Sequence, residues 1–322
     1  MTARGLLFAL TGAALPAVLG AHSPSEGAEA MPPRLPVILS TDCGTEIDDQ
    51  WAVICLMISP HIDPLGFIGN HARNGLDGQK ARATILDVLE NRLGAAQHPP
   101  VFAGSDGPLS APDRPNDNDG VRFLLDHSKR YSPTDRLNVL IIGSHTDVAS
   151  AILADPSIVQ RTRVVMMGMY AWPRGDDEWN VKNDPDAARV VFDSGVPLVV
   201  GCSEVCKRDL SFTTEECQAL VGGIGPCGAW LAKSFADYGG RLDMDGRKVW
   251  PIWDCITGAY LLGFAQVTEY HRPRLGPDLL FDHANPQGQM TWVTRVDTER
   301  FWADYAAKLK AWTAAKGEAP KP

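Results

Sequence analysis

The sequence predicts an α/β fold with a mostly parallel, open sheet and helices on both faces, in a Rossmann-like arrangement. Two observations lead to this prediction. Short apolar segments alternate with segments of helical pattern between residues 35 and 203. The apolar segments are rich in Val, Ile and Leu without polar alternation, which is typical of strands buried on both faces. No repeat or low-complexity linker follows residue 35, so we expect one domain over 31–322.

The predicted elements follow in chain order. We expect strands at 35–42, 62–70, 99–105, 137–144, 162–169 and 196–203. We expect helices between them at 48–59, 79–94, 146–161 and 184–195, and another after Asp254. The segment 106–120 is long and polar, which is typical of a mobile loop.

The net charge of the chain limits the kinds of partner that it can bind. The chain has 322 residues and a net charge of -9, which argues against a nucleic-acid partner.

Arg4 precedes an apolar run at 5–19, which is too short to span a bilayer comfortably, and small residues follow. Residues 1–30 therefore resemble a secretory signal peptide and linker, in preference to a membrane anchor or a buried helix. We expect a secreted or periplasmic protein without stable membrane insertion; whether it forms a homo-oligomer is open.

The seven cysteines are an odd number, so they cannot all pair within one chain. In an oxidising compartment one or two disulfides are expected among four of them, Cys202, Cys206, Cys217 and Cys227. A zinc site is the weaker interpretation, because the spacing is loose and no His lies near. The other three lie in apolar contexts typical of buried thiols.

Acidic residues crowd the segment STDCGTEIDDQWAV, residues 40–53, between two apolar runs. Its acids are Asp42, Glu46, Asp48 and Asp49. Carboxylates close together in a poorly hydrated place repel one another, so something must compensate for their charge. A helix N-terminus would favour Asp48 and Asp49 but does not account for Asp42 at the end of a strand.

Two metal sites can be considered for this segment. A magnesium-dependent phosphatase of the haloacid-dehalogenase type also begins strand–Asp–loop, but it needs a second Asp two residues later, where this chain has Gly44. A Ca²⁺ site built from carboxylates and main-chain carbonyls would offset the repulsion. Asp254, which precedes an apolar helix, fits as a further ligand.

In a parallel sheet, ligands bind beyond the carboxyl ends of the strands. This rule places residues far apart in sequence at one edge of the sheet. They are Asp42, Asn70, Ser144-His145-Thr146 and Glu178-Trp179-Asn180. His71 and His145 lie near this edge, where we expect structural, hydrogen-bonded histidines rather than general acids.

These segments resemble the nucleoside hydrolases, the calcium-dependent N-ribohydrolases. The resemblance begins with VILSTDCGTEIDDQWAV, in which the family's Asp-x-Gly-x-Asp-Asp pattern is two residues longer. It continues in consistent order over about 36–265 through GFIGN, IIGSHTDVASAI, VVMMGM, EWNVKNDPDAARVVF and IWDCITGAYLL.

The resemblance implies roles for nine residues. The metal ligands would be Asp42, Asp49, Asp254 and the main-chain carbonyl of Thr146. Asp42 also resembles the general base that takes a proton from a Ca²⁺-bound water. The residues that bind the nucleoside would be Asp48, Asn70, Glu178, Asn180 and Trp253, with Glu178 facing the 5′-hydroxyl. Glu46 lies in the two-residue extension, and no role carries over to it.

The implied chemistry suits these residue types. Cleavage of the C1′–N bond builds oxocarbenium character on the sugar, as in O-glycoside cleavage. A metal lowers the pKa of its bound water, and a carboxylate removes the proton. Some family members carry a His before the last metal-binding Asp, where this chain has Trp253. Purine-preferring members also have Trp there, so we expect Trp253 to stack on a purine, with Trp172 or Trp179 as the second face. The alternative is that Trp253 is a core residue, because Trp is often largely buried.

The sequence therefore predicts a secreted, Ca²⁺-dependent N-glycosyl hydrolase that releases free base and ribose from nucleosides, a reaction of purine salvage. Two alternatives stay open. The same fold and metal could serve another N-ribosyl or N-glycosyl compound. A non-catalytic secreted binding protein could keep the metal for stability, although such a protein needs no general base.

Overall fold

The computed structural model describes residues 34–176, 178–238 and 240–317. The predicted signal segment, residues 1–30, lies outside the described residues. None of the helices among the described residues is both long enough and apolar enough to cross a membrane.

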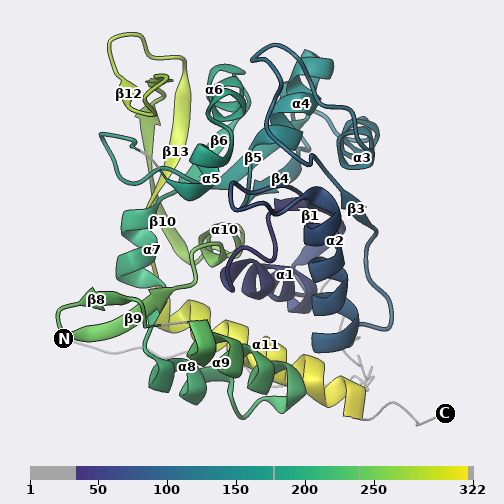
Figure 1. Cartoon of the computed structure of the whole chain (residues 1–322), viewed down its shortest axis with the longest axis vertical. Helices are drawn as coiled ribbons and strands as arrows, with labels where there is room; N and C mark the ends of the chain where they lie inside the picture. The colour runs from purple at the N-terminus through teal and green to yellow at the C-terminus, as the bar shows by residue number, and fades with distance from the viewer. Residues whose placement is uncertain (1–33, 177, 239, 318–322) are drawn as a thin grey trace, which may run out of the picture. The chain divides into compact units, whose positions relative to one another are not determined.

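An eight-stranded sheet runs through the domain in the order β10-β13-β6-β5-β4-β1-β2-β3 (Figure 1). All neighbours from β13 to β3 are parallel, and only the edge strand β10 is antiparallel to its neighbour. The strands are β1 (Leu35–Thr41), β2 (Ile62–Gly69), β3 (Val101–Ala103), β4 (Leu137–Ile141), β5 (Thr162–Met167), β6 (Leu198–Gly201), β10 (Ala265–His271) and β13 (Gln289–Val296). The mostly parallel α/β fold predicted from the sequence is confirmed.

Helices cover both faces of this sheet (Figure 1). On one face α3 (Asp119–Ser128), α4 (Thr146–Ala154) and α6 (Pro185–Asp193) pack together. On the other, α1 (Asp48–Ile58) packs against α10 (Cys255–Leu261) and α11 (Thr298–Gly317). The remaining helices are α2 (Gly78–Leu86), the π-helix η1 (Asp87–Arg92), the 3-10 helix η2 (Pro156–Gln160), α5 (Trp179–Asn183), α7 (Ser203–Asp209), α8 (Thr214–Val221) and α9 (Gly225–Tyr238).

Helix α1 is apolar on nearly every side because it lies between the sheet and α11. Trp51 is fully buried, and its ring lies 5.4 Å from that of Tyr305 and 5.8 Å from that of Trp302, both on α11. The Tyr305 hydroxyl donates to the Trp51 carbonyl at 3.3 Å. This packing holds the N-terminus of α1, with its acidic residues, at the edge of the sheet.

Several boundaries differ from the sequence prediction. The helix expected at 146–161 ends at Ala154, because Pro156 cannot continue the α-helical bonding, and η2 follows. The helix expected at 79–94 becomes π-helical in η1, where Leu93 N donates to Val88 O. Helix α3 begins at Asp119, inside the segment predicted as loop.

The C-terminal part contains strands that the sequence pattern did not reveal. A three-stranded antiparallel sheet has the order β7-β9-β8 and comprises β7 (Ser211–Phe212), β9 (Arg247–Pro251) and β8 (Leu242–Met244). A two-stranded sheet pairs β11 (Arg274–Leu275) with β12 (Phe281–Asp282). Strand β9 matters for function because it leads directly into the segment that carries Trp253 and Asp254.

The disulfides expected among Cys202, Cys206, Cys217 and Cys227 do not form. All seven cysteines are free thiols, and all are buried. Cys206 illustrates the reason: its Sγ donates to the Trp253 carbonyl at 3.4 Å and lies 3.8 Å from Met167 Sδ, so it packs as a small apolar side chain.

The strand order reverses direction at β1. The chain passes from β1 outward to β2 and β3, and then returns to place β4 on the other side of β1. In open α/β sheets, the crevice beyond the carboxyl ends of the strands at such a reversal is the usual ligand site. Asp42 follows β1 and Ser144 follows β4, so the topology places both beside this crevice.

Candidate active site and metal centre

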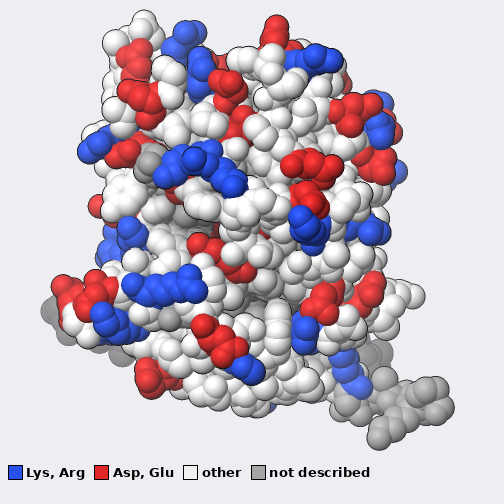
Figure 2. Space-filling view, viewed as in Figure 1, with Lys and Arg blue, Asp and Glu red and all other residues white. Residues whose placement is uncertain are grey.

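A pocket of about 210 Å³ opens at the carboxyl edge of the sheet. It is lined by Asp42, Thr45, Glu46, Asp48, Asp49, Ile142, Tyr170, Glu178, Trp179, Asn180, Ser203, Lys207, Trp250, Trp253 and Asp254. Figure 2 shows acidic side chains in a hollow on this face of the molecule. Seven of the nine residues assigned by resemblance line the pocket; Asn70 and Thr146 do not.

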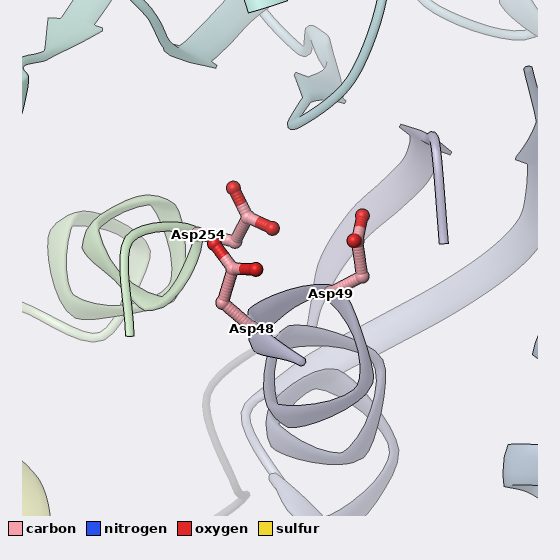
Figure 3. Close-up of side chains that lie close together, drawn as sticks. All are labelled: Asp48, Asp49 and Asp254. Carbon is pink, nitrogen blue, oxygen red and sulfur yellow. The ribbon is translucent and has the colours of Figure 1, made fainter. Parts of the chain in front are cut away.

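Three buried carboxylates converge at the pocket (Figure 3). Asp48 and Asp49 open α1, and Asp254 precedes α10, so two helix N-termini bring them together. One oxygen from each lies within 4.8 Å of the others. Thr41 Oγ1 donates a hydrogen bond to Asp49 Oδ1 and so orients that carboxylate.

The raised pKa values of these three carboxylates indicate whether the cluster suits a cation. Burial raises the pKa of Asp48, Asp49 and Asp254 well above the usual range, and neighbouring carboxylates raise it further. Removing charge from water is costly unless an opposite charge or a proton compensates. Three buried carboxylates within reach of one point are the oxygen ligands that a hard divalent cation prefers, so the donor set fits a metal.

Asp42 follows β1 and lines the same pocket, but it is not part of this cluster of three. Burial is the main cause that raises the pKa of Asp42 to about 7. Asn183 Nδ2 donates to Asp42 Oδ2 at 3.3 Å. The cluster thus contains Asp48, which the resemblance assigned to the sugar, and omits Asp42, which it assigned to both metal and catalysis.

Gly143, directly after β4 and Ile142, permits the close approach of β4 to β1 at this point. A Cβ atom at position 143 would lie 2.3 Å from Asp42 N, 2.9 Å from Asp42 Oδ1 and 2.7 Å from Asn70 Oδ1. Real Cβ atoms are essentially never found at such distances, so only glycine fits here without displacing Asp42.

Asn70 and Thr146 lie in a buried polar network behind the pocket. Asn70 Nδ2 donates to Ser40 Oγ at 2.9 Å and to Ser144 O at 3.0 Å. Thr146 Oγ1 donates to Asp184 Oδ2 at 2.7 Å and lies 2.8 Å from His71 Nε2. The roles assigned to Asn70 and to the Thr146 carbonyl stay predictions.

Neither histidine predicted near this edge lines the pocket. His71 belongs to the polar network, as expected of a structural histidine, and burial lowers its pKa. His145 is fully buried, and only a weak contact with the Asn180 backbone satisfies its ring, so the well hydrogen-bonded histidine expected from the sequence is not found at this position. Burial lowers the pKa of His145 to about 4, which keeps the ring neutral.

Glu178 and Asn180 also line the pocket. Glu178 Oε2 caps α5 by accepting hydrogen bonds from Asn180 N at 2.9 Å and Val181 N at 3.3 Å. Burial raises the pKa of Glu178 to about 8. Asn180 Nδ2 donates to Met167 O at 3.2 Å, which anchors it to the end of β5.

Four aromatic side chains, Tyr170, Trp179, Trp250 and Trp253, also line the pocket. Trp253 and Trp250 meet edge to face, with ring centres 5.9 Å apart. Tyr170 and Trp179 are unusually exposed for aromatics, at 44% and 39%. Trp172 is not available as a second stacking face, because it stacks on Tyr270 at 4.1 Å and does not line the pocket.

Sequence reasoning missed several lining residues. Glu46, to which no role was assigned, accepts a hydrogen bond from Trp250 Nε1 at 3.1 Å and so braces the aromatic wall. Trp250 lies three residues before Trp253, a spacing that could have indicated it. Tyr170 directly follows the strand predicted at 162–169, so the strand-end rule could have indicated it. Lys207 had no such signal, because the packing of α7 beside the pocket depends on the tertiary fold.

Comparisons with known proteins agree with this architecture. The family model described as inosine-uridine preferring nucleoside hydrolase matches residues 37–303. An uncharacterized protein of Schizosaccharomyces pombe is 26% identical over 251 residues, covering 66% of this chain and 79% of that protein. The pyrimidine-specific ribonucleoside hydrolase RihB of Escherichia coli is 27% identical over 185 residues, covering 49% of this chain and 57% of RihB.

Solved structures show the same fold. The plant nucleoside hydrolase PpNRh1 superposes with a TM-score of 0.72 at 17% identity, over 87% of this chain and 100% of that one. The purine-preferring ribonucleoside hydrolase of Gardnerella vaginalis gives 0.70 at 18% identity, over 87% and 99%. Together with the family match, which spans most of the chain, these findings confirm the family expected from the sequence motifs: the chain belongs to the inosine-uridine preferring nucleoside hydrolases, a family of N-glycosyl hydrolases.

Proposed function

We propose that this protein hydrolyses the N-glycosidic bond of ribonucleosides, with a preference for purine nucleosides, and that its metal is Ca²⁺. The observation that carries the proposal is one pocket lined by a buried carboxylate cluster, by the polar side chains of Glu178 and Asn180 and by several aromatic rings. The partial match to RihB does not determine the base, because it covers only 57% of that protein.

The metal would be held by Asp49 and Asp254, with Asp48 or Asp42 and the Thr146 carbonyl completing the ligand set. When bound, Ca²⁺ would offset the repulsion of the cluster and make a water molecule more acidic. All-oxygen ligands favour a hard cation such as Ca²⁺ over zinc, which prefers nitrogen and sulfur.

The residues of the chain would divide the remaining work. Asp42 would accept the proton of the water that attacks C1′. Glu178 and Asn180, rigidly placed by α5 and β5, would hold the sugar hydroxyls, so that C1′ faces the nucleophile. The carboxylates beneath the sugar would stabilise its oxocarbenium character.

Purine preference is supported by the aromatic wall. Trp253 precedes Asp254 and borders the pocket beside the cluster, where a base attached to C1′ would lie. Stacking on Trp253 would be stronger for the larger surface of a purine.

A panel of nucleosides tests both activity and preference. Purified, Ca²⁺-loaded protein should release free base and reducing sugar from inosine or guanosine with a higher kcat/KM than from uridine. Release only from another class of N-ribosyl compound would support a different substrate on the same fold. If uridine is the better substrate, the purine preference is wrong.

Export is the remaining part of the proposal. The signal-like segment supports a secreted or periplasmic protein whose mature domain starts near residue 31. N-terminal sequencing of protein from the expressing cell should find a start between about residues 21 and 31, since cleavage follows small residues. A cytoplasmic protein that retains Met1 would contradict it.

A further inference from the structure

Lys207 is the one basic residue that lines the pocket, within the residues that the structure describes. It lies on α7, and the family resemblance assigned it no role. The other charged residues of the lining are all carboxylates, so a single ammonium group shares the pocket with six acids, Asp42, Glu46, Asp48, Asp49, Glu178 and Asp254.

Aromatic groups, rather than these acids, hold the ammonium group. Lys207 Nζ lies 4.6 Å from the ring centre of Tyr170 and 5.9 Å from that of Trp253. It also donates a hydrogen bond to the Tyr170 hydroxyl at 3.3 Å. In the part of the chain that the structure describes, Lys207 forms no ion pair, so no carboxylate neutralises its charge directly.

The proposed stacking of the base on Trp253 puts this ammonium group on the leaving-group side of the pocket. Trp253 is the proposed stacking surface for the base, and the Lys207 ammonium lies beside that ring. The flexible methylene chain of a lysine allows its three donors to follow a bound group. No histidine lines the pocket among the described residues, so no imidazole is present to protonate the base. Glu46, an acid of the same lining, accepts a hydrogen bond from Trp250 Nε1, so that carboxylate oxygen is already engaged.

We propose that Lys207 is a catalytic residue that donates a hydrogen bond to the leaving base and stabilises the negative charge that develops on it. This inference rests on the proposed function. The C1′–N bond breaks and its electron pair passes to the base nitrogen. The attacking water gives its hydroxyl to C1′ and its proton to Asp42. The base departs as an anion that is hydrogen-bonded to the Lys207 ammonium, and this anion then takes a proton from solvent. Asp42 returns to solvent the proton that it accepted from the water.

The proposal predicts an effect that depends on the leaving group. Hypoxanthine is a poor leaving group and needs its charge stabilised, whereas p-nitrophenolate is already a stable anion. A purely structural Lys207, which only clamps Tyr170, would affect both substrates equally. The ratio of the two rates therefore separates the catalytic role from a structural one.

The experiment compares the wild type with Lys207→Met and Lys207→Gln, using inosine and p-nitrophenyl riboside. Lys129→Met is the matched control, because Lys129 is exposed, pairs only with Asp126 and lies outside the pocket. For inosine, kcat should fall by about 10²–10³-fold in both Lys207 variants, the range for removing one donor to a developing charge. For p-nitrophenyl riboside, kcat should change by less than about threefold, since little charge stabilisation is needed.

Three outcomes would overturn the inference. Unchanged inosine turnover would show that the ammonium does not act on the base. An equal loss for the two substrates would make Lys207 structural. Wild-type protein that cleaves p-nitrophenyl riboside but no nucleoside would overturn the proposed substrate class and this role together. If Lys207→Met does not fold, as judged by circular dichroism, Lys207→Gln alone decides, since glutamine keeps a polar end at this partly exposed position.

Discussion

Removal of the metal should lower the thermal stability of the protein, because it leaves the repulsion within the carboxylate cluster uncompensated. Oxygens of Asp48, Asp49 and Asp254 lie within 4.8 Å of one another. At an effective dielectric constant of about 20, two unit charges at that separation repel by about 3.5 kcal/mol, so three ionised carboxylates repel by roughly 10 kcal/mol in total. Without a cation the cluster must take up protons or move apart.

Ca²⁺ that binds only the folded state at about 100 times its Kd stabilises that state by about 2.7 kcal/mol. For a domain of this size each kcal/mol shifts Tm by roughly 2–4 °C, so the expected rise is about 5–10 °C. Scanning calorimetry in a chelator, followed by titration with Ca²⁺, measures it.

Variants make the assay specific to the cluster. Asp49→Asn should abolish the Ca²⁺-dependent rise in Tm, because a metal-binding carboxylate is lost. Asp237→Asn is the matched control: Asp237 is an exposed acid of α9 that pairs with Lys233, and its variant should respond as the wild type does. A wild-type Tm that is identical in chelator and in millimolar Ca²⁺ would refute the argument that the cluster requires a cation.

Three further predictions concern single residues of the pocket. Asp42→Asn keeps the shape of the side chain but cannot accept a proton, so kcat should fall by about 10²–10⁴-fold with KM less affected; near wild-type turnover would remove Asp42 from the role of base. Trp253→Ala should cost about 1–3 kcal/mol in kcat/KM for inosine, the range of base–aromatic stacking, and should hardly affect p-nitrophenyl riboside; equal losses would make Trp253 a packing residue. Gly143→Ala forces a Cβ to within 2.3 Å of Asp42 N, so calorimetry should show a loss of about 1–3 kcal/mol in stability together with reduced turnover; a variant with unchanged Tm and kcat would contradict the close packing of β4 on β1.

The parallel core was predictable because its strands are buried on both faces and carry continuous apolar runs. β4 is buried at every position, and its sequence is apolar apart from Asn138. The edge strand β10 is largely exposed, so its residues lack the apolar run that identified the others. β7 and β8 span only two and three residues, too few for any periodicity to appear.

The same distinction applies to the pocket. The motif that carries Asp48 and Asp49, and the apolar helix after Asp254, could be located from sequence, and Asp254 was expected as a further ligand of the same site. The strand-end rule concerned other residues: Asp42 and Glu178-Trp179-Asn180 line the pocket, whereas Asn70 and Ser144-His145-Thr146 do not. The sequence could not show that Asp48, rather than Asp42, joins Asp49 and Asp254 in the cluster, because this depends on side-chain directions at two helix N-termini. The position of Lys207 at the pocket and the bond between Glu46 and Trp250 could not be predicted either, since both depend on tertiary contacts. The expected disulfides were wrong because Cys spacing does not report which way a thiol points.

The most direct test of the proposed function is the quantification of both products from inosine by the Ca²⁺-loaded protein, with Asp42→Asn measured in parallel. Nucleoside hydrolysis predicts hypoxanthine and ribose in equal amounts, formed continuously by the wild type and at least about 100-fold more slowly by the variant. If the folded, Ca²⁺-loaded wild type released neither product, or if Asp42→Asn released both at the wild-type rate, the proposed hydrolysis at this pocket would be contradicted.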